Sequence, residues 1–169
     1  MKIENIIDQL EHNKSCFRGL FEDKSEEMYL YRPQENKWCL LEIACHLLDE
    51  EKEDFRARIK YIFDHPDYDM PSINPPAWVT ERNYISRDFQ IVVSLFLEER
   101  EKSVAWLRDR VHANWEDQIN HPKLGVMSAK LFLNNWLAHD YLHMRQILRL
   151  HYAFLKDQSG LNLDYAGNW

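Results

Sequence analysis

Long stretches of this chain contain neither glycine nor proline, and this scarcity favours a helical fold. The 169 residues include only four glycines and six prolines, and four of the prolines lie between positions 64 and 85. Proline and glycine are the residues that most readily interrupt helices, so the rest of the chain has room for long ones. A chain of this length is enough for one sizeable core and short for two. We therefore expect one all-α domain spanning residues 1–169.

Apolar residues recur at steps of three or four in four segments, as in helices that bury one face. The segments begin near residues 3, 38, 86 and 128. Ser86 and Ser128 stand where a helix N-cap offers a side-chain oxygen to exposed backbone N–H groups. Pro33 closes the first segment, and Gly160 is expected to close the fourth. The pattern predicts a four-helix bundle.

Residues 64–85 separate the second predicted helix from the third, and they combine four prolines with aromatic side chains. A loop of this length is unusual inside a compact domain. It is explained if the second and third helices run parallel, because the chain must then travel back along the bundle. The loop can also cover a functional site, and Tyr68 and Trp78 are its candidates for lining a pocket.

The balance of charges excludes some classes of partner. The formal charge is −7, whereas binding to nucleic-acid phosphates needs a clustered basic surface. Uncharged runs such as residues 131–139 are far shorter than the roughly 20 apolar residues that span a bilayer. Glu4 and Asp8 interrupt the stretch that a signal peptide would keep apolar, and three cysteines without framework spacing agree with a reducing compartment. We expect a cytoplasmic protein with no nucleic-acid or membrane partner.

Two histidines, His139 and His143, lie four positions apart in the stretch LAHDYLHMRQI. On a helix their side chains rise from one face about 6 Å apart, and both can reach one cation at about 2.0–2.1 Å. The simpler alternative is a pair of half-buried histidines with ordinary hydrogen-bond partners. The pair alone does not decide between the two.

A third histidine, His46, lies in the middle of the second predicted helix beside the apolar residues Ile43 and Leu47. A neutral imidazole buried there needs partners for both ring nitrogens, and a metal ion supplies one of them. Three histidines from two facing helices would leave one coordination position open, as in catalytic rather than structural zinc sites. Imidazole ligands suit zinc, nickel, iron or copper, so we expect one divalent ion of undefined identity.

Glu50 follows His46 by one helical turn, and three roles are open to it. It can orient a ligand, act as a base on a water at the metal, or pair in solvent with Lys52 or Arg56. The run of charges over residues 49–53 favours the solvent role.

Asp140 and Gln146 flank the paired histidines and are candidates for hydrogen bonds that orient them, although a surface position is favoured for both. Cys39 precedes His46 by two turns, about 10 Å, which is too far for both to bind one ion. Cys45 is assigned to the core, and no basic residue is placed by sequence to activate either thiol as a nucleophile.

Two stretches resemble the DinB-like (YfiT-like) superfamily of metal-dependent enzymes. The first is RPQENKWCLLEIACHLLDEE and the second is NNWLAHDYLHMRQI. The resemblance implies a four-helix bundle with an up-down-down-up course, a long crossover between helices two and three, and a homodimer. It also implies one divalent metal ion on His46, His139 and His143. Cys39 stands where a Ser or Thr cap is expected, which would weaken the first turn of that helix.

The resemblance further implies an activity. Relatives with known activity resemble metal-dependent thiol transferases, which join a low-molecular-weight thiol to an electrophilic small molecule, or thiol-dependent isomerases, and we expect the transfer. A metal-assisted hydrolase with Glu50 as base is the alternative enzyme. A metal-stabilised dimer that binds a partner without catalysis is the alternative outside enzymes.

Overall fold

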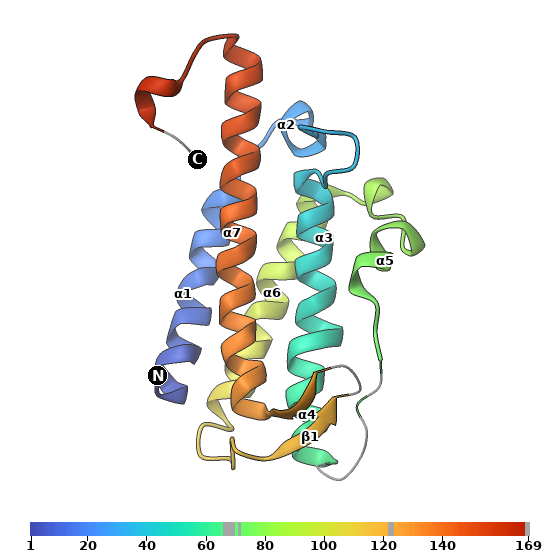
Figure 1. Ribbon diagram of the computed structural model, residues 1–169, viewed down its shortest axis with the longest axis vertical. Coiled ribbons are helices and arrows are strands. Elements are labelled where there is room, and N and C mark those ends of the chain that lie inside the picture. Colours follow the sequence, from blue (N-terminus) through green and yellow to red (C-terminus); the bar gives the residue numbers. More distant parts are fainter. Residues whose placement is uncertain (66–69, 71, 122–123, 168–169) are drawn as a thin grey trace.

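The structure, a computed structural model, describes residues 1–65, 70, 72–121 and 124–167. It is mainly helical, as the sequence predicts. The long helices lie side by side in Figure 1: α1 (Ile3–Phe21), α3 (Leu40–Glu50), α6 (Phe89–Arg108) and α7 (Ala129–Ser159). α3 continues through the π-helical turn η1 (Glu51–Phe55) into α4 (Arg56–Asp64). The short elements are α2 (Glu26–Leu30), α5 (Pro75–Glu81), the 3-10 turns η2 (Tyr84–Ser86) and η3 (Asp164–Ala166), and an antiparallel hairpin of β1 (Gln118–His121) and β2 (Gly125–Ser128).

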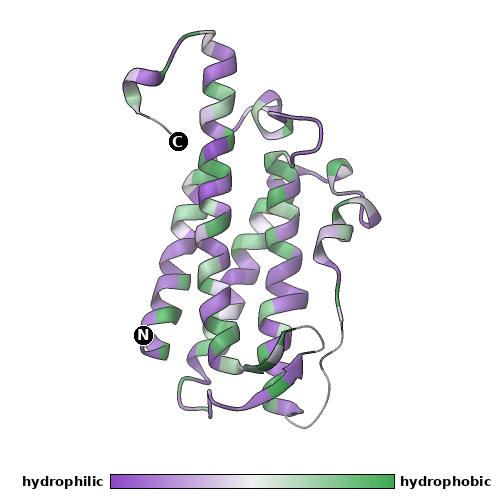
Figure 2. Ribbon diagram, in the orientation of Figure 1, coloured by the Kyte–Doolittle hydropathy of each residue, from purple (hydrophilic) through white to green (hydrophobic). Residues whose placement is uncertain are grey.

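The long helices bury apolar faces against one another. Hydrophobic and hydrophilic residues are interleaved along α1 and α7 in Figure 2, as expected for helices with one face in a core. Ile6, Leu10 and Phe17 of α1 are completely buried at this spacing. Within the described residues, no helix combines the length and apolar character needed to cross a membrane.

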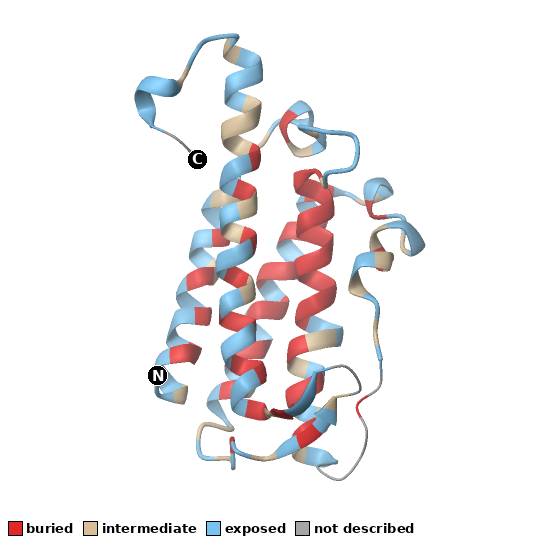
Figure 3. Cartoon of the chain, in the orientation of Figure 1, coloured by how far each residue is buried: buried red, intermediate tan, exposed pale blue. Residues whose placement is uncertain are grey.

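α3 is the most enclosed element of the fold. All of its residues are buried, and Figure 3 shows it covered along its whole length. α6 and α7 pack against it within the bundle, and α2, α5 and η2 also contact it. Trp78 of α5 packs into the apolar core, whereas Tyr68 lies outside the described residues. The segment between α4 and α6 therefore helps to enclose the helix that carries His46.

The ends of the helices agree with the sequence at some positions and differ at others. Ser128 caps α7, since its hydroxyl accepts a hydrogen bond from the backbone N–H of Leu131, and Gly160 ends α7 with a left-handed backbone at φ 62°. Ser86, by contrast, does not cap α6. Asp88 does so instead, because its carboxylate accepts from the N–H of Ile91 at 2.9 Å. α1 already ends at Phe21, and the β1–β2 hairpin occupies a connection in which no strand was expected.

Candidate metal centre

Three histidines from two facing helices converge in the bundle. His46 comes from α3, and His139 and His143 come from successive turns of α7. The Nε2 atoms of His139 and His143 lie 3.0 Å apart, and one ring nitrogen from each of the three histidines lies within 4.8 Å of the others. The ring of His46 has its centroid 5.4 Å from that of His139 and 4.9 Å from that of His143. The structure thus brings together the three residues singled out by sequence.

The spacing of these nitrogens fits a metal ion. Ligands at about 2.0–2.1 Å from a tetrahedral ion lie about 3.3 Å from one another. The observed separations, from 3.0 Å to at most 4.8 Å, bracket that value. The Nδ1 atom of His46 is buried, and no described residue offers it a hydrogen bond. A buried nitrogen without a partner is unfavourable, and a bound cation is one way to satisfy a histidine in this position.

Burial holds the three imidazoles in the neutral form that binds metals. Desolvation, and after it the neighbouring imidazole of His143, lowers the pKa of His46 to about 3 and that of His139 to about 2. Desolvation also lowers the pKa of His143, although the side chain of Gln146 opposes this shift. Neutral imidazoles keep a lone pair, so no proton has to be displaced at neutral pH before a cation binds.

Aromatic rings support the histidines from both sides. The ring of Trp38 lies 5.0 Å from that of His46, and the ring of Phe55 lies 5.0 Å from that of His139. Phe55 in turn stacks on Trp136, with 5.6 Å between centroids. These contacts restrict the rotation of the imidazoles and exclude water from one side of each ring.

Glu50 faces the site, so the favoured interpretation of a carboxylate in solvent is wrong. Its side chain is buried, and one carboxyl oxygen lies 3.8 Å from Nδ1 of His46. Burial and a hydrogen bond to Asp54 raise the pKa of Glu50 to about 9. Arg56, the partner expected from sequence, instead bonds to Glu99 and to the hydroxyl of Ser103.

The π-helical turn η1 lies immediately after Glu50. Within this turn, Asp54 forms an ion pair with Nε of Arg58 in α4, and the Nη1 atom of Arg58 is buried without an acceptor among the described residues. Single π-helical turns inside α-helices are frequent at functional sites. A row of polar side chains therefore continues from His46 past the site.

Asp140 is completely buried, and the expectation of a surface position is wrong for this residue too. Its carboxylate accepts two hydrogen bonds from the guanidinium of Arg100, at 2.7 and 2.8 Å, and one from Asn13 at 3.0 Å. Arg100 also donates to Glu51 at 2.8 Å, and Trp136 donates to the same carboxylate at 3.2 Å. This network joins α1, η1, α6 and α7 directly beside His139. It was hidden from the sequence because its partners come from four separate segments.

The cysteines take no part in the histidine cluster. Cys39 is the N-cap of α3, and its backbone N–H donates to the carboxylate of Glu42 at 3.0 Å. Cys39 and Glu42 form a capping box, because the sulfur of Cys39 also accepts from the backbone N–H of Glu42 and so takes the place of the expected Ser or Thr oxygen. Burial raises the pKa of the Cys39 thiol and raises that of Cys45 to about 12, which agrees with the absence of an activating base in the sequence.

Two cavities adjoin the histidines. The first has a volume of about 520 Å³ and has His143 in its wall, and the second has a volume of about 380 Å³ and has His139 in its wall. Leu142 borders both cavities. Small molecules can therefore approach the cluster from two sides.

Comparisons with known proteins agree with this geometry. A sequence model of the DinB superfamily matches residues 9–147. Among solved structures, YfiT from Bacillus subtilis is similar with a TM-score of 0.77 and 16% sequence identity, over 95% of this chain and 89% of YfiT. YfiT is described as a probable metal-dependent hydrolase with an unusual four-helix bundle topology. At this identity the similarity shows a shared fold alone. A search of curated proteins finds no significant match.

Proposed function

Because the chain belongs to the DinB superfamily, we propose that it is a metal-dependent enzyme with one divalent ion held by His46, His139 and His143. This membership confirms the resemblance found in the two sequence stretches. The proposal rests on the convergence of three neutral imidazoles, two of them buried and that of His139 partly buried, at the border of two cavities.

The reaction that we favour transfers a low-molecular-weight thiol to an electrophilic small molecule. The thiol sulfur loses its proton to solvent and forms a bond to the electrophilic carbon, while the bond from that carbon to its leaving group breaks and the group departs with the electron pair. A divalent ion supplies a positive charge that favours the thiolate over the thiol. Two cavities at one cluster support this reaction, because a transfer needs room for two reactants.

Hydrolysis is the second candidate, and the position of Glu50 favours it. Its carboxyl group lies next to His46, and a divalent ion held by the three histidines would offset the burial that raises the pKa of Glu50 to about 9, so that the carboxylate could accept a proton from a water near the cluster. The description of YfiT as a probable metal-dependent hydrolase supports the same alternative. A role without catalysis is less well supported, because such a site would be closed by packing rather than bordered by cavities.

Several accompanying features belong to the same proposal. The path of residues 72–88 beside α3 supports an up-down-down-up course with a long crossover between α4 and α6 (Figure 1). The three free cysteines support a cytoplasmic location. Tyr141, Leu148 and Leu155 are exposed at seven-residue spacing on α7, which supports a homodimer through this helix. We also treat residues 1–169 as a single domain.

The metal can be tested directly by elemental analysis of the purified protein. Replacing any of His46, His139 or His143 by Ala should remove most of the bound metal. His112→Ala, at an exposed position, is the matched control and should retain it. Undiminished metal in the three site variants would refute the ligand assignment.

The reaction can be tested with the metal-loaded protein. Thiols paired with electrophiles should react, whereas a panel of esters and amides should not. Glu50→Gln should abolish activity if the enzyme is a hydrolase that uses Glu50 as base. Turnover of esters or amides that depends on Glu50, without thiol transfer, would replace the first candidate by the second.

A further inference from the structure

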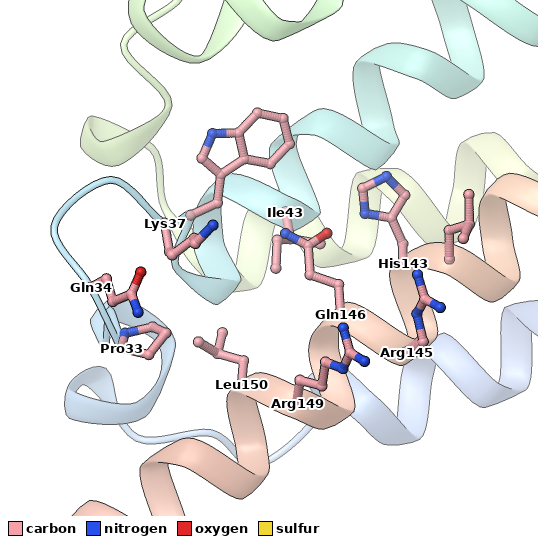
Figure 4. Close-up of a pocket in the computed structure, with 11 residues that line it drawn as sticks. Pro33, Gln34, Lys37, Ile43, His143, Arg145, Gln146, Arg149 and Leu150 are labelled. Atoms are coloured by element: carbon pink, nitrogen blue, oxygen red, sulfur yellow. The ribbon is translucent and has the colours of Figure 1, made fainter. Parts of the chain in front are cut away.

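The larger cavity at the cluster has a distinct composition. It lies between the segment that leads into α3 and the middle of α7, and Figure 4 shows His143, Arg145, Gln146 and Arg149 along its α7 side. Its volume, about 520 Å³, is within the range of small-molecule sites. We call it the cationic cavity; its lining also includes Lys37, Trp38, Ile43 and Leu150.

Positive charge is concentrated around this cavity in a chain that is acidic as a whole. Lys37, Arg145 and Arg149 all line it and are exposed. In the described part of the chain, none of the three forms an ion pair with a carboxylate, whereas most other arginines do. The formal charge of the protein is −7, so this group of unpaired cations is a local exception. An anionic ligand would complement it.

The inner part of the cavity is apolar. Ile43 and Leu150, which are buried, and the half-buried indole of Trp38 line it together with the cations and His143. Such a lining suits a ligand that combines an anionic group, for example a carboxylate, with a short, weakly polar body. The edge beside His143 brings the end of such a ligand to the three-histidine cluster.

We propose that the cationic cavity binds the thiol reactant, and that this reactant is a small thiol bearing a carboxylate. Arg145 and Arg149 contact the carboxylate, the body of the molecule lies on Trp38, and the sulfur reaches the cluster beside His143. The smaller cavity beside His139 then receives the electrophile. This assignment rests on the proposed thiol transfer, but the recognition of the carboxylate can be measured without it.

The test compares three probes that differ by single groups. N-acetylcysteine carries both the thiol and the carboxylate, N-acetylcysteamine lacks the carboxylate, and N-acetylalanine lacks the sulfur. Calorimetric titration of the metal-loaded protein should show that N-acetylcysteine binds roughly tenfold more tightly than N-acetylcysteamine, the effect of two charge contacts at an accessible site. N-acetylalanine should bind the metal-free protein, and its affinity should fall as the salt concentration rises.

Two double variants test whether Arg145 and Arg149 bind the carboxylate. The double variant Arg145→Gln/Arg149→Gln should bind N-acetylcysteine and N-acetylalanine roughly tenfold more weakly and leave N-acetylcysteamine unchanged. Lys2→Gln/Lys156→Gln removes the same charge at exposed positions outside both cavities and should bind all three probes as the unmodified protein does.

The outcomes separate this inference from the proposed function. Equal binding of N-acetylcysteine and N-acetylcysteamine, or equal effects of the two double variants, would overturn the assignment even if thiol transfer occurs. Loss of N-acetylalanine binding only in Arg145→Gln/Arg149→Gln would support it even if no thiol is transferred.

Discussion

Replacing Arg100 by Met is expected to destabilise the fold by about 3–5 kcal/mol, because it would leave two buried carboxylates without their cation. Arg100 and Glu51 are each 1% exposed, and Asp140 is fully buried. The guanidinium makes three hydrogen bonds of 2.7–2.8 Å to these two carboxylates. A domain is stable by only about 5–15 kcal/mol, so the loss would be a large share of the total.

Urea unfolding followed by tryptophan fluorescence measures this loss. With a slope of about 2–3 kcal/mol per molar urea, the midpoint should fall by roughly 1–2.5 M. Arg108→Met is the matched control, because Arg108 is on the same helix and also pairs with two carboxylates, those of Asp8 and Glu11, but at exposed positions. The control should lose less than about 1 kcal/mol. Equal midpoints for the two variants would refute the argument that burial of the charges, rather than their pairing, decides the energy.

Three further predictions concern protons, thiols and a helix cap. Burial lowers the pKa of His46 to about 3, so below about pH 6.5 the unfolded chain binds more protons than the folded one. The metal-free protein should therefore keep its stability above pH 6.5 and lose up to about 1.4 kcal/mol per pH unit and per such histidine as the pH falls. Unchanged urea midpoints from pH 7.5 to 5.5 would contradict this. Cys16 is exposed, whereas burial raises the pKa of the Cys45 thiol to about 12. A thiol reagent should therefore modify one cysteine rapidly in the native protein and none in the Cys16→Ser variant. A second rapid phase would show that a buried thiol is accessible. Asp88→Ala should lower the free energy of unfolding, measured in urea, by about 1 kcal/mol, and Ser86→Ala should lower it much less. A larger loss for Ser86→Ala would mean that α6 begins two residues earlier.

The sequence predicts the helices better than it predicts where they start. The three-or-four spacing identifies the long helices, and Ser128 and Gly160 mark the ends of α7. Ser86 and Asp88 are equally acceptable caps by residue type, and a tertiary contact decides between them. The hydroxyl of Tyr84 donates to the buried carboxylate of Asp49 at 2.7 Å, and residues 84–86 form a separate 3-10 turn. The helix can begin only after that turn.

The histidines could be predicted, but the acidic residues around them could not. Helical spacing places His139 and His143 on one face, and the apolar neighbours of His46 indicate that it is buried. The charged run around Glu50 looks like a solvated surface, because a local pattern contains no information about distant partners. Asp140 is neutralised by Arg100, 40 residues earlier in the chain. Burial of a carboxylate is thus decided by long-range pairing rather than by its own segment.

The π-helical turn explains how one helix can line both the cluster and the smaller cavity. His46, Glu50, Asp54 and Arg58 follow one another at steps of four residues. In an α-helix each such step overshoots a full turn by about 40°, so three steps would carry Arg58 about 120° away from the face of His46. The i→i+5 hydrogen bonds of η1 place more residues in one turn and reduce this drift. Asp54 and Arg58 accordingly line the same cavity as His139, although a strict 3.6-residue pattern would place them on a different side. In the folded chain these four residues form one continuous polar row beside the candidate metal centre. A search for helical periodicity in the sequence would instead assign them to different faces, as unrelated surface charges.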